Sequence, residues 1–252
     1  MTKKKQYAPS PGSINDKADQ LIKLIRKAGK DSSERLNALL EMGSILCECS
    51  IASPNEYLQD YMILYSEHTD NKIKIQAGLS LIEILTYRDG NFFEALHILD
   101  AIKMLASSSE IDTALQNKVR KSAIFLSIHF RWFDDARNGL KYFEKTEHQF
   151  DRSWYMMASG YVDFLQNNTF SFHKFRNAKD SFSIEFKSYK DHSDLYRALL
   201  YYQAKEIENA LLLFEKLQDS YHPKTRLFAH LGVACCTNSK EDYQKYLSLY
   251  NG

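Results

Sequence analysis

The chain has 252 residues, 44% of them apolar and 26% charged, a balance that favours a folded protein over a disordered one. Its 33 Lys and Arg nearly cancel its 32 Asp and Glu, so it lacks the basic excess with which most nucleic-acid-binding proteins neutralise phosphates. With only 9 Gly and 4 Pro, it has few of the residues that make the many turns of an all-β protein. We therefore expect no nucleic-acid partner and no fold built from short strands.

Residues 1–13 contain Pro9, Pro11 and Gly12 and few apolar side chains, which predicts a disordered tail. The basic run at residues 3–5 fits a solvated tail, and because no apolar segment follows it we expect no signal peptide. No run approaches the roughly 18 consecutive apolar residues of a membrane span. The protein is therefore expected to be cytoplasmic, without membrane insertion, and to meet membranes only through partners.

Apolar residues recur at the three- and four-residue spacing of amphipathic helices, and no alternating β-branched run predicts a strand. Leu21, Ile22 and Ile25 show this spacing in the first helix, and Gly29 ends it. The predicted helices cover residues 18–28, 33–49, 54–68, 73–87, 92–105, a long segment from about 111 to 131, 132–142, 152–165, 170–189, 194–204, 207–218, 224–236 and 240–250. The whole chain is therefore expected to be all-α.

Local signals place several helix ends. Residues 53–56 read Ser-Pro-Asn-Glu, in which Ser can cap, Pro suits the first helical position and Glu can return a hydrogen bond. Residues 89–91 read Asp-Gly-Asn, a strong turn signal, and residues 107–110 read Ser-Ser-Ser-Glu, a second predicted cap. A polar break is also predicted at residues 190–192.

Small residues stand at matching places in the second helix of successive helix pairs. We align Ala95, Ala136, His173 and Ala210, which are 41, 37 and 37 residues apart by subtraction of their numbers. A period in the thirties or forties made of two helices indicates a helical repeat array, and His173 predicts a degenerate repeat. The expected fold is an all-α, right-handed α-solenoid of antiparallel helix pairs, in one domain over residues 14–252 with its clearest repeats at about 73–250.

The units at residues 79–99, 123–143 and 198–214 resemble tetratricopeptide repeats in these positions. The family's first-helix Gly and Tyr are only hinted at by Gly160-Tyr161, and no Pro closes the units. The resemblance implies a superhelix that acts as a protein-interaction scaffold or adaptor and is not an enzyme.

A narrower resemblance rests on Asp135-Ala136-Arg137 with Leu140-Lys141, on residues 158–162 and on the closing helix at residues 240–249. These segments look similar to the repeat region of the epsilon subunit of coatomer. The resemblance implies a non-enzymatic solenoid that binds another coat subunit in vesicle-mediated transport, although the N-terminal third of this chain departs from that family.

No motif of enzyme chemistry stands out. The chain has no Gly-rich phosphate loop, no nucleophile elbow and no pair of His at i, i+4 spacing. Ser171 and Lys174 match S-x-x-K by letters alone. The four cysteines lack the spacing of a zinc site and are expected to pack as small hydrophobic residues; they are Cys47 with Cys49 and Cys235 with Cys236. We therefore expect no catalysis, no metal and no cofactor.

Partner binding is the remaining expectation, because the first helices of a solenoid line a concave face that can take up a peptide or helix of a protein. By helix position, the residues expected to contact a partner are Lys118, Lys121, Arg152, Tyr155 and Arg197. Trp132 and Trp154 are expected in the core. Two other functions would use the same groove: a chaperone for a secreted or assembly client, and a regulator that senses a peptide and acts on a DNA-binding partner.

The last helix carries Tyr243, Tyr246, Leu247 and Tyr250. Repeat arrays expose apolar surface at their ends unless a cap covers it. We therefore expect this face to be self-associated or covered by a partner.

Overall fold

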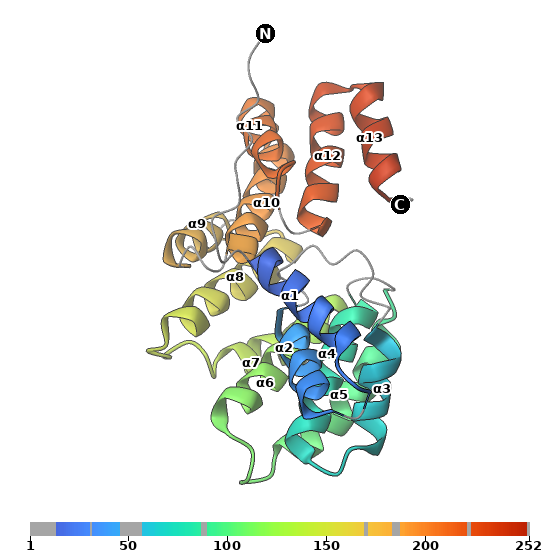
Figure 1. Cartoon of the computed structure of the whole chain (residues 1–252). Helices are drawn as coiled ribbons and strands as arrows, with labels where there is room; N and C mark the ends of the chain where they lie inside the picture. Colours follow the sequence, from blue (N-terminus) through green and yellow to red (C-terminus); the bar gives the residue numbers. More distant parts are fainter. Residues whose placement is uncertain are drawn as a thin grey trace. The chain divides into compact units, whose positions relative to one another are not determined.

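The computed structural model describes residues 14–30, 32–45, 57–86, 90–168, 171–182, 187–220 and 223–250. These residues form thirteen helices and no strand (Figure 1), which confirms the all-α prediction. The helices are α1 (Ile14–Lys27), α2 (Ser33–Ile45), α3 (Leu58–Glu67), α4 (Asn71–Ile84), α5 (Phe92–Ala106), α6 (Thr113–His129), α7 (Phe133–Leu140), α8 (Gln149–Leu165), α9 (Ser171–Ser181), α10 (Lys187–Gln203), α11 (Ile207–Leu217), α12 (Pro223–Thr237) and α13 (Lys240–Tyr250).

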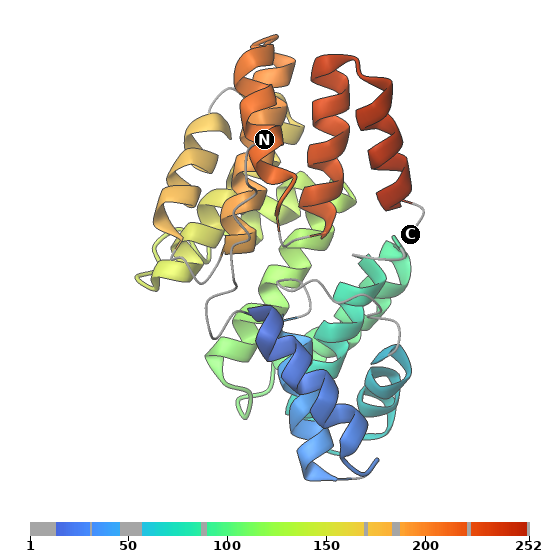
Figure 2. The same cartoon turned by 45° about the horizontal axis from the view of Figure 1, so that its top comes forward.

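The helices belong to two compact units, one up to Gln116 and one from Asn117, which includes most of α6. In the first unit, α1 packs on α2, and α4 packs on α2, α3 and α5. In the second, each helix from α7 to α13 packs on the next, and α8, α10 and α12 also contact one another in sequence (Figure 2). This neighbour-on-neighbour packing is that of a helical solenoid. The predicted right-handedness and the single domain over residues 14–252 stay predictions.

The core of the first unit depends on a close approach of α2 to α4. Ile25 of α1, Met42 of α2 and Tyr61 of α3 are all buried, and the Tyr61 hydroxyl donates a 2.8 Å hydrogen bond to the Leu39 carbonyl. A Cβ on Gly43 would lie 2.1 Å from the Ser80 hydroxyl oxygen of α4. A larger residue at this crossing would therefore force the Ser80 side chain to move.

The turns that close the first helix of each pair share one backbone conformation. Residues with positive φ occur at Gly90, Arg131, Asn167, Lys205 and Asn238, 33 to 41 residues apart by subtraction of their numbers. After three of them, the next backbone N–H donates to the carbonyl five residues earlier at 2.8–2.9 Å, as in a Schellman motif: Trp132 to Ser127, Asn168 to Asp163 and Glu206 to Tyr201. The repeat period of the sequence is thus also a repeat of backbone geometry.

Lys205 occupies its turn at φ 63°, where a side chain with a Cβ is strained. We expect Lys205→Gly to raise the free energy of unfolding by about 1 kcal/mol, since relief of that strain exceeds the extra entropy of glycine in the unfolded chain. Urea unfolding monitored by circular dichroism measures it. Asn167→Gly is the matched control and should gain less, because Asn tolerates this conformation; an equal or larger gain at Asn167 would contradict the explanation.

The second helix of each pair, together with the turn that follows α7, contains buried residues at a spacing of four and then three. The buried sets are Ala95, Leu99 and Ile102; Ala136, Leu140 and Phe143; Ser171, Phe175 and Ala178; and Ala210, Phe214 and Leu217. The third set corrects the sequence alignment, because Ser171 is fully buried whereas His173 is exposed. His173 lies two residues further along the helix, about 200° around its axis, so the small residue of this repeat is Ser171.

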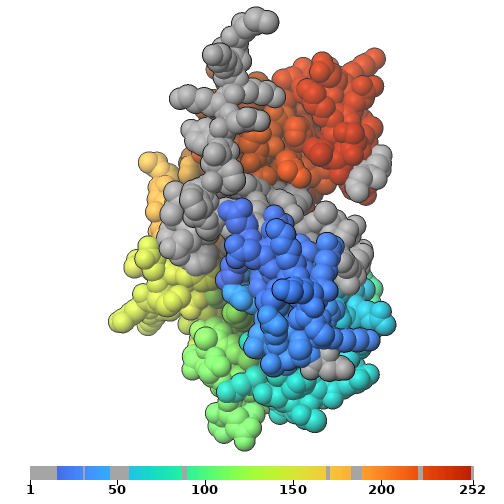
Figure 3. All heavy atoms as spheres, viewed as in Figure 1, coloured from blue at the N-terminus to red at the C-terminus, as the bar shows by residue number. Residues whose placement is uncertain are grey.

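The last helix, α13, has apolar residues at the same spacing, but they are not buried. Tyr243, Leu247 and Tyr250 of α13 are 48%, 37% and 66% exposed, and no described residue of α13 is buried. The rings of Tyr243, Tyr246 and Tyr250 stack in a file with centroids 5.9 and 6.0 Å apart. The surface of this helix, in red, is visible beside α12 in Figure 3. Its coverage by a second copy or by a partner stays a prediction.

Several boundary predictions need correction. The helix predicted at 170–189 corresponds to two helices, α9 and the start of α10. The break predicted at 190–192 lies inside α10, where the Ser193 hydroxyl donates a 2.9 Å hydrogen bond to the Tyr189 carbonyl. Asp112, not the serine run, caps α6 by accepting a 2.8 Å hydrogen bond from the Leu115 N–H. The tail at 1–13, the cap at 53–56 and Cys47 with Cys49 lie outside the described residues.

Two side chains predicted to be buried are not. Trp132 is 45% exposed and stacks on Phe130 with centroids 4.8 Å apart, since it precedes α7 and points away from the helix pair's interior. Cys235 is also exposed, whereas Trp154 packs in the core as predicted.

Candidate protein-interaction face

A continuous line of aromatic side chains crosses three first helices of the second unit. We call it the aromatic row; its members are Phe125 and His129 of α6, Tyr161 and Phe164 of α8, and Tyr196 of α10. The ring of His129 lies 4.4 Å from Phe125 and 6.5 Å from Tyr161, centroid to centroid. Tyr161 in turn stacks on Tyr196 at 4.6 Å. The packing of α8 on α10 thus joins the rings of successive repeats into one surface.

The aromatic row is partly open to solvent and firmly supported beneath. Phe125 is 40% exposed, and Tyr161, Phe164 and Tyr196 are each partly exposed. Tyr196 stacks at 4.9 Å on Phe175, which is fully buried. Burial raises the pKa of Tyr161 and, more strongly, that of Tyr196, and their side chains are hydrogen-bonded to each other. The rings are therefore held in place before any partner arrives.

Two cations act on the aromatic row. His129 keeps an exposed side chain, yet desolvation by its packed neighbours chiefly, and Lys224 of α12 in addition, lower its pKa to about 4. Arg131, in the turn after α6, favours the ionised form of Tyr161 and so opposes the rise that burial causes in its pKa. No carboxylate in the described part of the chain is among the groups that shift the pKa of His129, Tyr161 or Tyr196.

The low pKa of His129 predicts a small loss of stability in acid, because solvent screens a side chain that is exposed. Between about pH 6.5 and pH 4 the unfolded chain takes up a proton at this residue while the folded chain does not, so stability is full above about 6.5 and falls as the pH approaches 4. We expect the melting temperature of His129→Gln to fall slightly less over this range than that of the unaltered chain, with His97→Gln, on α5 and outside the aromatic row, as control. An NMR titration midpoint near 6.5 for the His129 ring would contradict this.

Behind the aromatic row, buried aspartates of the first helices bind cations of neighbouring helices. Asp163 of α8 is 2% exposed, and its carboxylate lies 2.5 Å from the Lys174 Nζ of α9 and 3.3 Å from Arg137 of α7. Asp194 of α10 is 1% exposed and lies 2.6 Å from Arg197, 2.9 Å from Lys179 of α9 and 3.4 Å from Lys216 of α11. These carboxylates connect adjacent repeats and are engaged in ion pairs.

The five predicted partner-binding residues divide by environment. Lys118 and Arg152 are exposed, and Tyr155 is half-buried, with its pKa raised chiefly by burial. The side chain of Lys121 is only 16% exposed, pairs with Asp151 and lies 4.4 Å from the Phe150 ring centroid. Arg197 is 15% exposed and pairs with Asp194. The structure therefore places Lys121 and Arg197 in internal ion pairs, and partner binding by all five stays a prediction.

The aromatic row was not predicted, although the sequence carries a signal for it. Phe125, Tyr161 and Tyr196 follow one another at 36 and 35 residues, by subtraction of their numbers, which is the period of the repeat itself. Aromatic residues that recur at a repeat period fall on one side of successive helices. Searching for that recurrence, and not only for the small residues, would have found these rings.

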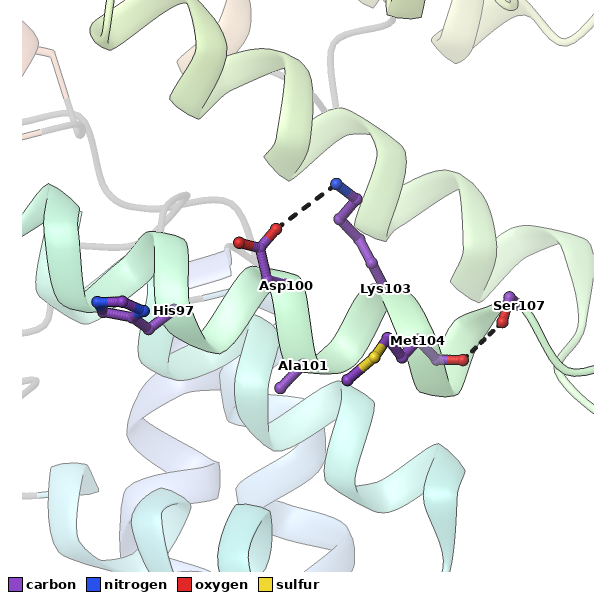
Figure 4. A pocket seen from close by; sticks show the side chains of 6 residues that line it. All are labelled: His97, Asp100, Ala101, Lys103, Met104 and Ser107. Atoms are coloured by element: carbon purple, nitrogen blue, oxygen red, sulfur yellow. Dashed lines mark hydrogen bonds and ion pairs between the residues drawn. The ribbon is translucent and has the colours of Figure 1, made fainter.

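A shallow hollow lies over the outer side of α5 in the first unit (Figure 4). Five of the labelled side chains come from this helix, and Ser107 follows its end. Asp100 faces Lys103 at 3.6 Å, and the Ser107 hydroxyl donates to the Met104 carbonyl at 2.6 Å. Residues of a single exposed helix face do not surround a ligand. This hollow is therefore a weaker candidate than the aromatic row.

Comparison with protein families, with curated proteins and with solved structures finds no match for this chain. Within the described ranges, no group of three or more His, Cys, Asp or Glu is placed to hold a metal ion. No helix among the described residues is both long and apolar enough to cross a membrane.

Proposed function

We propose that this chain is a non-catalytic protein-interaction scaffold, an adaptor subunit of tetratricopeptide-like type that works in the cytoplasm. The observation that carries the proposal is the aromatic row, in which partly exposed rings from three successive first helices form one supported surface. Tyr, Phe and Trp are enriched at protein interfaces because they bury much area with few rotatable bonds. A surface held rigid before binding also loses little conformational entropy when a partner docks.

The polar groups near the aromatic row support binding over catalysis. Asp163 and Asp194 are held in ion pairs between repeats, and Lys174, the lysine of the S-x-x-K match, is bound to Asp163. A buried carboxylate whose oxygens already bind cations of neighbouring helices holds those helices together and is not open to a substrate.

The resemblance to the epsilon subunit of coatomer supports a particular scaffold, a coat subunit in vesicle-mediated transport. In that case the aromatic row, or the α13 face, takes up a neighbouring subunit. A chaperone or a peptide-sensing regulator would use the same surface and differ in what it binds, so the partner decides among the three.

The proposal is tested by affinity purification of the tagged chain from its own cells, followed by quantitative mass spectrometry. We expect Phe125→Ala together with Phe164→Ala to reduce recovery of the main partner by about tenfold or more, the loss expected when interface anchors are truncated. Phe93→Ala is the matched control, because Phe93 is 72% exposed on α5 and should leave recovery unchanged. Circular dichroism confirms that the variants fold.

Recovery of coat subunits in fixed stoichiometry would favour a function as a vesicle-coat subunit. Recovery of a single secreted or unfolded client would favour a function as a chaperone. Unchanged recovery of every partner by the folded double variant would overturn the proposal.

A further inference from the structure

Charge is distributed unevenly between the two kinds of helix in the second unit. The first helices, α6, α8, α10 and α12, contain nine Lys and Arg but only four Asp and no Glu. The second helices, α7, α9, α11 and α13, contain seven basic and seven acidic residues. A chain with a formal net charge of +1 therefore concentrates its positive charge on the helices that carry the aromatic row.

Every aspartate of these first helices already has a partner within the chain. Asp151 pairs with Lys121, Asp163 and Asp194 are bound as described above, and Asp191 accepts a 2.7 Å hydrogen bond from the Ser220 hydroxyl. Most of the cations that neutralise them come from second helices, namely Arg137, Lys174, Lys179 and Lys216. The first helices therefore keep an excess of positive charge, with exposed Lys118 and Arg152 among its carriers.

Two cations lie close enough to the aromatic row to act on its rings. Arg131 is exposed in the turn two residues after His129 and acts on Tyr161. Lys224 acts on His129 from the first turn of α12, which packs on α10. One helical turn after Lys224, on the same side of α12, Phe228 is 47% exposed. The aromatic surface is thus accompanied by positive charge from the end of α6 and from the start of α12.

We propose that the aromatic row binds an acidic protein segment, whose apolar side chains lie on the rings and whose carboxylates face Arg131 and Lys224. This inference rests on the proposed function and specifies the chemistry of the partner. Apolar anchors supply the buried area, while the cations attract acidic segments and repel basic ones. Charge of one sign on the binding face is therefore the source of specificity.

Single-stranded nucleic acid also binds to cations and aromatic rings, so it is the rival ligand. Base stacking requires an open ring face. Tyr196 is already stacked against both Tyr161 and Phe175, at 4.6 and 4.9 Å. Two of the first-helix cations, Lys121 and Arg197, are also occupied in internal ion pairs. These contacts favour a protein segment.

The test uses three fluorescent peptides of equal length and the full chain, with binding followed by anisotropy at low and high salt. The first peptide combines Glu with Leu and Trp anchors, the second replaces each Glu by Lys, and the third replaces each anchor by Ser. A single-stranded oligonucleotide is the fourth probe. We expect the first peptide to bind about tenfold or more tightly than the others, with an advantage that shrinks as salt rises.

The variant Arg131→Asn with Lys224→Gln should reduce the affinity of the acidic peptide relative to the other peptides by about tenfold. Asn is chosen at residue 131 because it tolerates the positive φ there. Arg176→Gln is the matched control, since Arg176 is an exposed cation of the second helix α9. Equal or tighter binding of the basic peptide, an acidic preference that survives the double variant, or no binding of any peptide would overturn the inference. Tighter binding of the oligonucleotide would overturn it in favour of nucleic acid.

The two proposals can fail separately. If a cellular partner is lost with Phe125→Ala and Phe164→Ala but persists at high salt and in Arg131→Asn with Lys224→Gln, the charge inference is wrong and the scaffold stands. If no cellular partner depends on the aromatic row, the scaffold proposal itself fails.

Discussion

Replacing Asp194 with alanine is expected to lower the free energy of unfolding by about 3 to 5 kcal/mol, the loss seen when one partner of a buried ion pair is removed. The carboxylate is 1% exposed and binds cations from α9, α10 and α11. Lys216 is 62% exposed, so its pair contributes little. Arg197 and Lys179 are 15% and 27% exposed, and the substitution leaves their charges without a counterion in a largely buried site.

Urea unfolding of Asp194→Ala, Asp194→Asn and the unaltered chain measures this effect. The asparagine variant keeps the shape of the side chain and isolates the loss of charge, so most of the destabilisation should remain. Asp135→Ala, at an exposed site in the first turn of α7, is the control and should change stability by less than about 1 kcal/mol. A loss below about 1 kcal/mol for Asp194→Ala would show that the carboxylate does not connect the repeats as described.

The helical architecture could be predicted because the spacing of apolar residues along each helix indicates which of its faces is buried. The prediction for α13 at residues 240–250 matches the structure at both ends, and that for α11 differs by one residue. The register of the third repeat could not be predicted in this way, because Ser171 is polar and is therefore not recognisable as a core residue from the sequence. Burial, and not residue type, identifies it.

The ion pairs could not be predicted from the sequence for a related reason. Asp163 meets Arg137 and Lys174 across sequence separations of 26 and 11 residues, and Asp194 meets Lys216 across 22. Which charged residues face one another depends on how neighbouring helices are rotated about their axes. Lys121 and Arg197 were therefore expected on a binding face by helix position, although each side chain turns toward a buried aspartate.

The Lys121–Asp151 pair allows a direct test of how much such ion pairs contribute to the stability of this fold. Its Nζ pairs with Asp151 and lies 4.4, 5.4 and 5.6 Å from the ring centroids of Phe150, Trp154 and Phe143. Burial lowers the pKa of Lys121 although Asp151 acts to raise it. Desolvation is the largest influence on the pKa of this lysine, and the nearby charge of Lys118 adds to it. Replacing both partners of a buried ion pair by uncharged residues often costs little.

We accordingly expect Lys121→Met alone to destabilise the chain by about 3 kcal/mol, because Asp151 is left charged and largely buried. The loss should lie at the low end of the usual range, since Asp151 stands in the first turn of α8, where the helix dipole favours a negative charge. Adding Asp151→Asn should recover about 2 kcal/mol, giving a large coupling in a double-mutant cycle. Lys145→Met is the control, because Lys145 is exposed and is not among the groups that act on Lys121. If the double variant is as unstable as Lys121→Met, the lost stability comes from the contacts of the lysine with the three rings and not from the unpaired carboxylate.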